Sequence, residues 1–220
     1  GATIKTEVPI FDTDINPNGD YIVTGGWNTD IDIFNTKTGE KEFTLIGNKN
    51  AVTAVRFLSS GQHIVSGGKD GTVRLYNINE EEDEDFFKLE SGSINKIDLS
   101  NDDKLVAASN DQGAINIISI PGMDRVQTVI LGKNTVVLDL AFSFDNKEIF
   151  IGTQNKIVLR YDLKTGKLSK INGHIGAVVK TSTSKNGKFL ATGSNDLSVK
   201  LWNTKDDKPV LTIPTSKTPG

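Results

Sequence analysis

Cysteine is absent from the 220 residues, and histidine occurs only at His63 and His174. Without cysteine the chain has no disulfide, no thiolate nucleophile and no thiolate metal ligand. Two histidines far apart in the sequence give no cluster of the kind that holds a catalytic metal ion. No run of about 18 apolar residues is present, as a transmembrane helix would require. We therefore expect no membrane span, no metal site and no cofactor.

The N-terminal residues lack the charged and apolar regions of a secretion signal, and the sequence has no Asn-x-Ser/Thr glycosylation motif. Together with the absence of disulfides, these features favour an intracellular protein, either cytoplasmic or nuclear.

The charge is nearly balanced, with 25 lysines and arginines against 28 aspartates and glutamates, a net of −3. Six of the acids form one run from Glu80 to Asp85, so the other residues sum to +3. We expect no broad field of one sign, which argues against nucleic acid as a partner. The run itself predicts an extended, solvated loop that a basic partner, such as a lysine-rich tail, can use.

A short β-forming block occurs five times along the chain. A glycine or serine in each block fixes the period, with spacings of 42, 42, 43 and 41 residues: Gly25, Gly67, Ser109, Gly152 and Gly193. A turn rich in Gly, Asn or Asp precedes most blocks, and a second apolar strand follows each after about eight residues. A fixed period of this length indicates a repeat architecture.

Each repeat supplies four short strands, which we name a to d in chain order. In the second repeat we expect them at about 51–58, 63–68, 72–78 and 85–89. An antiparallel four-stranded unit cannot cover both of its faces alone, and stacking such units as blades around an axis gives an all-β propeller. The expected repeats are approximately 6–47, 48–89, 90–132, 133–173 and 174–216.

The fifth repeat carries Gly173-His174, then Thr192-Gly193-Ser194-Asn195-Asp196, then Val199-Lys200-Leu201-Trp202-Asn203, and the second repeat carries similar residues at 66–77. These motifs resemble those of the WD-repeat (Trp-Asp repeat) β-propeller family over nearly the whole chain. The resemblance implies a single propeller domain over residues 1–220. It leaves two alternatives for the number of blades: a closed ring of five, or a fragment of a longer ring such as one of seven.

The resemblance also implies a buried hydrogen-bond chain in the fifth repeat, built from Trp202, Thr192, His174 and Asp196. In the second repeat the matching residues are Tyr76, Ser66, Asn48 and Asp70. The third and fourth repeats lack such a set and are expected to rely on apolar packing. We therefore interpret His174 as a structural residue and not as a catalytic one.

In the family, the d–a and b–c loops line one end of the ring, which commonly holds peptides or partner domains. The residues that the resemblance places there, just before the turn Asp position, are Trp27, Lys69, Asp111, Gln154 and Asn195; Phe11, early in the first strand a, maps to the same end. Trp27 is an aromatic residue where the other repeats have polar ones. Exposed aromatics beside a cation are typical of binding hot spots. The alternatives are that Trp27 folds over a neighbouring loop or a missing blade, and that Phe11 points inward.

These features favour a non-catalytic scaffold for protein–protein interaction, with proteins or peptides of unknown identity as partners. An enzyme lacks support, because the aspartates fall mainly at repeated turn positions and no glycine-rich loop opens a helix. The alternative function is binding of a glycan, a lipid head group or nucleic acid by a propeller face.

Overall fold

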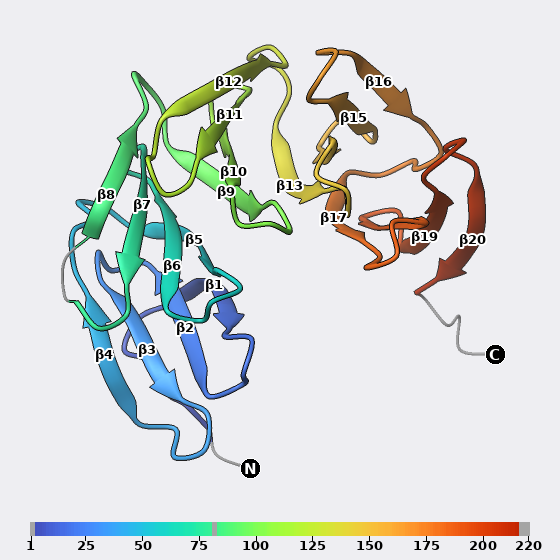
Figure 1. Cartoon of the computed structure of the whole chain (residues 1–220). Helices are drawn as coiled ribbons and strands as arrows, with labels where there is room; N and C mark the ends of the chain where they lie inside the picture. Colours follow the sequence, from blue (N-terminus) through green and yellow to red (C-terminus); the bar gives the residue numbers. More distant parts are fainter. Residues whose placement is uncertain (1–2, 81–82, 216–220) are drawn as a thin grey trace. The chain divides into compact units, whose positions relative to one another are not determined.

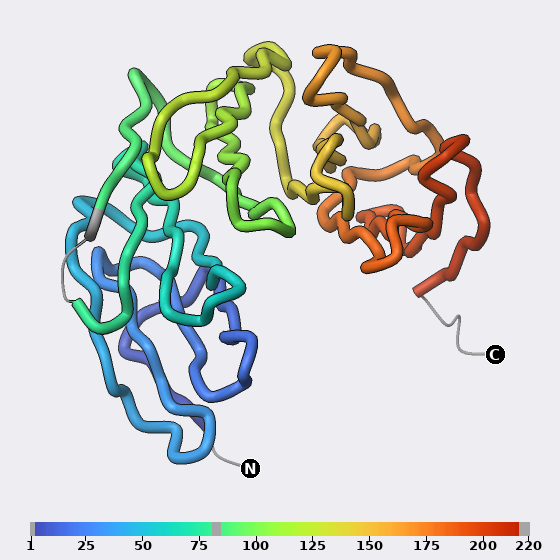
Figure 2. The backbone as a smooth tube through the Cα atoms, viewed as in Figure 1, coloured from blue at the N-terminus to red at the C-terminus, as the bar shows by residue number. Residues whose placement is uncertain are grey.

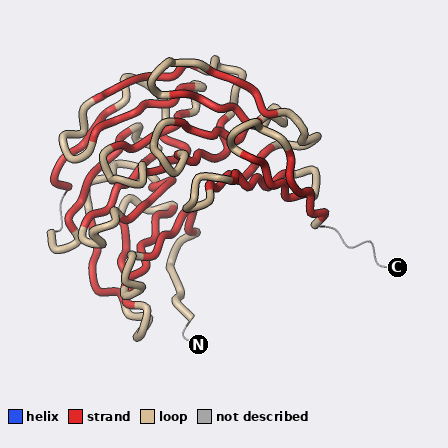
Figure 3. Tube along the Cα trace, turned by 45° about the vertical axis from the view of Figure 1, so that its right-hand side comes forward, coloured by secondary structure: helices blue, strands red, loops and turns tan. Residues whose placement is uncertain are grey.

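Short β-strands make up the regular structure of this chain. The computed structural model describes residues 3–80 and 83–215, and within them it contains 20 strands and no helix (Figure 3). The strands form five four-stranded antiparallel sheets, each following the chain order. The predicted all-β fold of WD-type four-stranded blades is confirmed. No helix that is long and apolar enough to cross a membrane occurs in the described ranges.

The chain divides into two units, and each is described separately: unit 1 is Gly1–Ile130 and unit 2 is Leu131–Gly220. Unit 1 contains three blades, which follow one another along the chain (Figures 1 and 2). Blade 1 consists of β1 (Ile10–Ile15), β2 (Tyr21–Gly26), β3 (Ile31–Asn35) and β4 (Lys41–Leu45). Blade 2 consists of β5 (Val52–Phe57), β6 (His63–Gly68), β7 (Thr72–Asn77) and β8 (Asp83–Lys88). Blade 3 consists of β9 (Ile94–Leu99), β10 (Leu105–Asn110), β11 (Ala114–Ser119) and β12 (Arg125–Ile130).

Unit 2 contains the remaining two blades. Blade 4 consists of β13 (Val137–Phe142), β14 (Glu148–Thr153), β15 (Val158–Asp162) and β16 (Leu168–Ile171). Blade 5 consists of β17 (Val178–Thr183), β18 (Phe189–Ser194), β19 (Ser198–Asn203) and β20 (Pro209–Pro214).

The loop within the acidic run is shorter than the sequence predicts. Strand β8 begins at Asp83, and Asp83 and Asp85 pair with Tyr76 and Leu75 of β7. The last three acids of the run therefore belong to a strand that pairs with β7 through its backbone. Glu81 and Glu82 lie outside the described residues. Charge on an outer strand also discourages pairing with other chains.

The repeated glycines of strand b are explained by the next blade. A Cβ added to Gly67 would lie 2.5 Å from Cγ2 of Ile94, and one added to Gly25 would lie 2.7 Å from Cγ1 of Val52. In unit 2, a Cβ on Gly152 would lie 2.8 Å from the carbonyl oxygen of Val178. The repeated glycines thus mark the positions at which the inner strand of one blade packs against strand b of the preceding blade.

Carboxylates on inner strands join neighbouring blades within each unit. In unit 1, Asp12 of β1 accepts a hydrogen bond from the Val55 N–H at 3.1 Å and Asp14 accepts one from the Phe57 N–H at 2.8 Å. In unit 2, buried Asp139 accepts one from the Thr181 N–H at 2.7 Å. Hydrogen bonds from backbone N–H groups satisfy these partly buried charges and fix the register of one inner strand against the next.

The apolar core lies between successive blades. One cluster combines Val23 and Ile31 of blade 1 with Val52 and Val55 of blade 2, and a second joins blades 2 and 3. In unit 2, Phe150 and Val158 of blade 4 pack with Val178, Leu190 and Trp202 of blade 5. These clusters cover both faces of blade 2 and one face of each other blade, so the loops of each unit extend from a packed base.

The two units differ strongly in net charge, although the charge of the whole chain is nearly balanced. Unit 1 has 11 basic and 21 acidic residues, a net of −10, whereas unit 2 has 14 basic and seven acidic residues, a net of +7. The near balance of the whole sequence hides this difference, because a division at residue 130 is not evident from composition.

Candidate functional site

The b–c turns that carry five of the predicted site residues share one backbone arrangement. In every blade, the predicted site residue of the b–c turn donates a hydrogen bond from its backbone N–H. The acceptor is the backbone carbonyl group of the residue just before strand a, at 2.8 to 3.1 Å. The pairs are Trp27 with Pro9, Lys69 with Ala51, Asp111 with Ser93, Gln154 with Val136, and Asn195 with Ala177. Each b–c turn is therefore fixed against the d–a loop of its own blade, and the side chain of the residue extends from a rigid backbone.

Strand a contains a β-bulge at the same end of every blade. The skipped residues are Phe11, Thr53, Asn95, Leu138 and Val179. A bulge bends the strand and redirects the side chain of the extra residue. Phe11 accordingly is 39% exposed and does not enter the core. The alternative in which Phe11 points inward is not what the structure shows.

Three predicted residues of unit 1 come together, and we call Phe11, Trp27 and Lys69 the aromatic patch. The rings of Phe11 and Trp27 meet edge to face with centroids 5.5 Å apart. The Nζ of Lys69, from the b–c turn of blade 2, lies 4.8 Å from the Trp27 centroid and 5.5 Å from the Phe11 centroid. Trp27 remains 61% exposed although it contacts the neighbouring turn. The patch is a preorganised apolar surface with a cation at its edge.

Asp111 is linked to this patch through the loop before β9. Its carboxylate accepts a hydrogen bond from the Ser93 N–H at 3.2 Å, and the Ser93 hydroxyl donates to the Lys69 carbonyl at 3.1 Å. The b–c turns of blades 2 and 3 are thus connected by one serine. Sequence reasoning missed Ser93, although its place in the d–a loop directly before β9 was a usable signal.

The two predicted residues of unit 2, Gln154 and Asn195, are exposed at the corresponding turns of blades 4 and 5. The b–c turns of blades 4 and 5, between β14 and β15 and between β18 and β19, contain no aromatic residue. They share the backbone geometry of the aromatic patch but not its side-chain chemistry.

The hydrogen-bond chain of the fifth blade is continuous. The Trp202 indole N–H donates to the Thr192 hydroxyl at 2.8 Å, and the two ring nitrogens of His174 lie 2.7 Å from that hydroxyl and from the Asp196 carboxylate. Asp196 also accepts hydrogen bonds from the Ile175 N–H at 3.0 Å and the Ser198 hydroxyl at 2.6 Å. The His174 side chain is 1% exposed, so substrate has no access to it.

Asp196 is held in its charged form by this chain. Burial alone would raise its pKa, but hydrogen bonds from Ser198, His174 and the Ile175 N–H together hold the pKa well below the ordinary aspartate value. A carboxylate that is ionised at all physiological pH values and fully hydrogen-bonded is suited to structure and not to proton transfer.

Blade 2 contains a shorter form of the chain. The Asn48 amide donates to the Tyr76 hydroxyl at 3.0 Å, and the Ser66 hydroxyl donates to Asn48 at 3.4 Å. Asp70 bonds the Lys49 N–H at 3.0 Å. An asparagine thus occupies the histidine position and bonds the buried hydroxyl groups of Tyr76 and Ser66.

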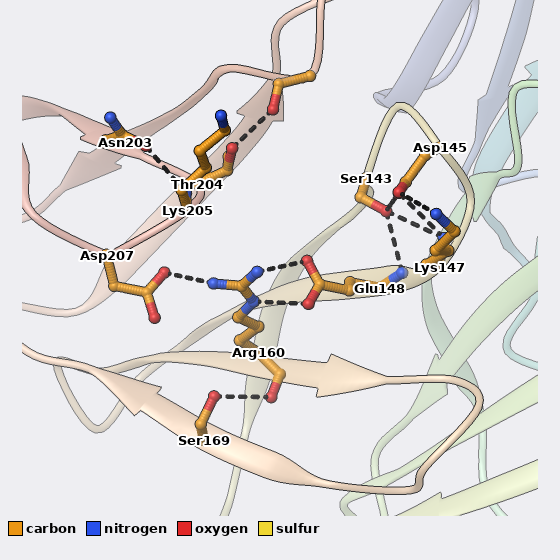
Figure 4. A network of polar contacts seen from close by, with 11 residues as sticks. Ser143, Asp145, Lys147, Glu148, Arg160, Ser169, Asn203, Thr204, Lys205 and Asp207 are labelled. Atoms are coloured by element: carbon orange, nitrogen blue, oxygen red, sulfur yellow. Dashed lines mark hydrogen bonds and ion pairs between the residues drawn. The ribbon is translucent and has the colours of Figure 1, made fainter.

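A second polar cluster lies between the blades of unit 2, and we call it the Arg160 cluster (Figure 4). Arg160 of β15 donates from Nε and Nη2 to the two oxygens of Glu148, at 2.8 and 2.7 Å, and from Nη1 to Asp207 of blade 5 at 2.8 Å. Its guanidinium also lies over the Phe150 ring at 5.6 Å. Burial alone would lower the pKa of Arg160. The hydrogen bonds to Glu148 and Asp207 and the negative charges of these residues outweigh burial, so the pKa lies above its ordinary value.

A cleft of about 360 Å³ opens beside this cluster, between the a–b turns of blades 4 and 5 and the c–d turn of blade 5. Phe144, Asn186, Gly187 and Lys205 line it together with Arg160. Sequence reasoning missed the cluster because Glu148, Arg160 and Asp207 lie on three separate elements and form no motif. The described residues contain no group of three or more His, Cys, Asp or Glu side chains placed to hold a metal ion.

Comparison with known proteins agrees with this architecture. The family described as "WD domain, G-beta repeat" matches residues 39–77 and 166–203. Similar proteins include pre-mRNA-processing factor 19 of Oryza sativa subsp. japonica, which is 28% identical over 95% of this chain and 41% of its own length. WD repeat-containing protein SL1-17 of Schistosoma mansoni is 24% identical over 89% of this chain and 65% of its own length. The serine-threonine kinase receptor-associated protein of Gallus gallus is 23% identical over 93% of this chain and 69% of its own length.

The chain spans less than two thirds of the length of the rice and Schistosoma relatives. Two of its repeats match the family directly, and all five have the same four-stranded blade with a bulged strand a and a fixed b–c turn. The family match and the shared blade architecture thus identify WD-type repeats in this chain.

Proposed function

We propose that this protein is a non-catalytic scaffold that assembles other proteins, and that the aromatic patch of unit 1 binds a protein or peptide partner. The observation that carries the proposal is the placement of Lys69 Nζ over both Phe11 and Trp27 while Trp27 stays 61% exposed. Aromatic side chains with an adjacent cation are enriched among the residues that dominate binding energy.

Rigidity of the patch supports the proposal. The Trp27 and Lys69 turns are each held by a backbone hydrogen bond, and the Phe11 bulge is fixed by pairing on both sides. A partner that binds a preorganised surface loses less free energy to ordering than one that binds mobile loops. Aromatic rings also supply a large contact area with few rotatable bonds.

The roles of the acidic residues support a non-catalytic function. Asp70 bonds the backbone of its own blade and pairs with Arg74, and Asp12, Asp139 and Asp196 are engaged in hydrogen bonds within or between blades. General acid–base catalysis requires such a group to face a substrate with a pKa near neutrality, and these carboxylates serve the fold instead.

The partner is proposed to be a protein. One relative is by name a receptor-associated protein, which is in line with this class of partner. We further propose that the five blades act as one WD-repeat domain without a cofactor, in an intracellular compartment, either cytoplasmic or nuclear.

The test is affinity capture from a cell extract with the wild-type protein, Trp27→Ala and Phe86→Ala. Phe86 is a matched control, because it is also an exposed aromatic residue of unit 1 but lies on the outer strand β8. We expect wild type and Phe86→Ala to retain a partner protein from the extract. The Trp27→Ala variant should stay folded but should not retain this partner. Equal retention by all three would refute the aromatic patch as the binding site.

A further inference from the structure

One end of the blades of unit 2 carries seven of the 14 basic residues of this unit. Adjacent hairpins of an antiparallel sheet place the a–b and c–d turns together, opposite the b–c turn. Seven exposed lysines occupy these turns in blades 4 and 5, and we call them the basic end: Lys147, Lys164, Lys167, Lys185, Lys188, Lys205 and Lys208.

The acidic residues at this end are already engaged. Asp145 pairs with Lys147 at 3.1 Å and Asp206 with Lys208 at 3.4 Å. Asp162 accepts hydrogen bonds from two backbone N–H groups of its own turn, at 2.7 and 3.0 Å. Glu148 and Asp207 are bound by Arg160.

Five lysines therefore have no carboxylate within 4.0 Å among the residues that the structure describes: Lys164, Lys167, Lys185, Lys188 and Lys205. Like charges gathered on exposed turns repel one another, and a bound anionic partner would relieve this repulsion.

The cleft beside the Arg160 cluster opens at this same end, with Lys205 on its wall. Three of the five guanidinium N–H groups of Arg160 donate to Glu148 and Asp207 (Figure 4). One N–H on each terminal nitrogen takes no part in these bonds. Phe144 also lines the cleft and is 46% exposed, at a turn position where the other repeats have Pro17, Ser59, Asn101 and Lys185. The cleft thus offers an apolar ring, donors and a cation within a rim of lysines.

We propose that the basic end of unit 2 is a second binding site, which takes an acidic segment of a protein partner. Carboxylates of the segment pair with Lys185, Lys188 and Lys205, and an apolar side chain of the same segment packs on Phe144 in the cleft. This site does not depend on the aromatic patch, because it lies in the other unit and uses none of its residues.

The aromatic content of this end favours an acidic peptide over nucleic acid. Single-stranded nucleic acid is bound by several aromatic platforms for successive bases, whereas Phe144 is the one exposed aromatic side chain of unit 2 among the described residues.

The test measures binding of a labelled polyglutamate peptide to the full chain by fluorescence anisotropy, with polyglutamine and oligouridylate as the other probes. We expect polyglutamate to bind at low salt and to weaken as salt rises, and polyglutamine not to bind. The triple variant Lys185→Gln, Lys188→Gln, Lys205→Gln should weaken binding about tenfold, as expected for the loss of three surface ion pairs.

A matched variant separates local geometry from net charge. Lys133→Gln, Lys156→Gln, Lys170→Gln removes the same charge from exposed lysines of unit 2 that lie away from the basic end, and its affinity should stay within about twofold of wild type. Equal weakening by both triple variants, or no binding of polyglutamate at low salt, would overturn the proposal. Tighter binding of oligouridylate with the same dependence on Lys185, Lys188 and Lys205 would also overturn it and assign the surface to nucleic acid.

The role of Phe144 is tested with peptides in which leucine replaces one glutamate. Wild type should bind the leucine-containing peptide more tightly than polyglutamate, and Phe144→Ser should lose this preference while it still binds polyglutamate. A preference that persists in Phe144→Ser would remove the cleft from the proposed site.

Discussion

The ammonium nitrogen of Lys69 lies 4.8 Å from the centre of the Trp27 ring, and the two residues belong to neighbouring blades of unit 1. This cation–π contact joins the b–c turns of blades 1 and 2, beyond the apolar core that lies beneath them. A cation–π contact of this kind stabilises one orientation of the exposed tryptophan side chain.

A double-mutant cycle measures this contact. Trp27→Ala and Lys69→Met, alone and together, should give a coupling free energy of about 0.5 to 1 kcal/mol in urea unfolding, as expected for an exposed cation–π pair. Lys49→Met is the control, since Lys49 is an exposed lysine of the loop before β5. The effects of Lys49→Met and Trp27→Ala on the free energy of unfolding should be additive. An equal coupling free energy of Trp27 with Lys49 and with Lys69 would contradict the contact.

Removal of His174 should lower stability without altering binding. His174→Ala leaves Thr192, Trp202 and Asp196 buried with fewer partners, so we expect a loss of about 3 kcal/mol in the free energy of unfolding. Partner retention per folded molecule should remain at the wild-type level. The control is His63→Ala, because His63 is only half-buried and lies 3.4 Å from the Ser60 hydroxyl. A folded His174→Ala protein that no longer binds would show that the chain serves function directly.

The lowered pKa of Asp196 predicts that the free energy of unfolding decreases in acid. Because its pKa is lower in the folded than in the unfolded state, the unfolded state takes up more protons as the pH falls below about 4. The stabilisation by Asp196 is therefore complete above that pH and is lost on further acidification. Urea unfolding at a series of pH values should show a steeper acid loss for wild type than for Asp196→Asn. Parallel curves for the two proteins would show that Asp196 makes no such contribution.

The strand-b glycines should be intolerant of a side chain where the next blade packs against them. In Gly67→Ala the new Cβ would lie 2.5 Å from Cγ2 of Ile94, and the overpacking should cost about 1 to 3 kcal/mol. Gly193→Ala is the matched control, because the nearest atom, Cβ of Lys180, is 3.7 Å away, an ordinary contact distance. A thermal melt that shows equal destabilisation of both variants would argue against the packing explanation.

Strand positions were predictable because turn residues and alternating apolar residues recur in every repeat. For the second repeat, the expected strands at 63–68 and 72–78 compare with His63–Gly68 and Thr72–Asn77 in the structure. The start of β8 was not predictable, because six like charges indicate a solvated loop unless the pairing offered by β7 is known. The bulge at Phe11 was also hidden, since it depends on register between two strands and not on residue type.

The site was predictable only in part, for a related reason. The family resemblance placed Trp27 and Lys69 at equivalent turns, but the distance between them depends on how closely two blades pack. The Arg160 cluster had no signal in the sequence, because an arginine on a strand beside a glutamate 12 positions earlier is common on solvent-facing sheets. Its distinguishing feature is Asp207, which the turn of the next blade brings to Nη1 of Arg160.

The central claim is that an exposed aromatic patch on a rigid scaffold binds a protein partner. The most direct measurement is the dissociation constant of the captured partner for wild type, Trp27→Ala and Phe86→Ala, with the folded fraction of each protein determined in parallel. We predict at least about tenfold weaker binding for Trp27→Ala, as for a residue that dominates an interface, and a wild-type value for Phe86→Ala. Equal dissociation constants for the three folded proteins would contradict the account.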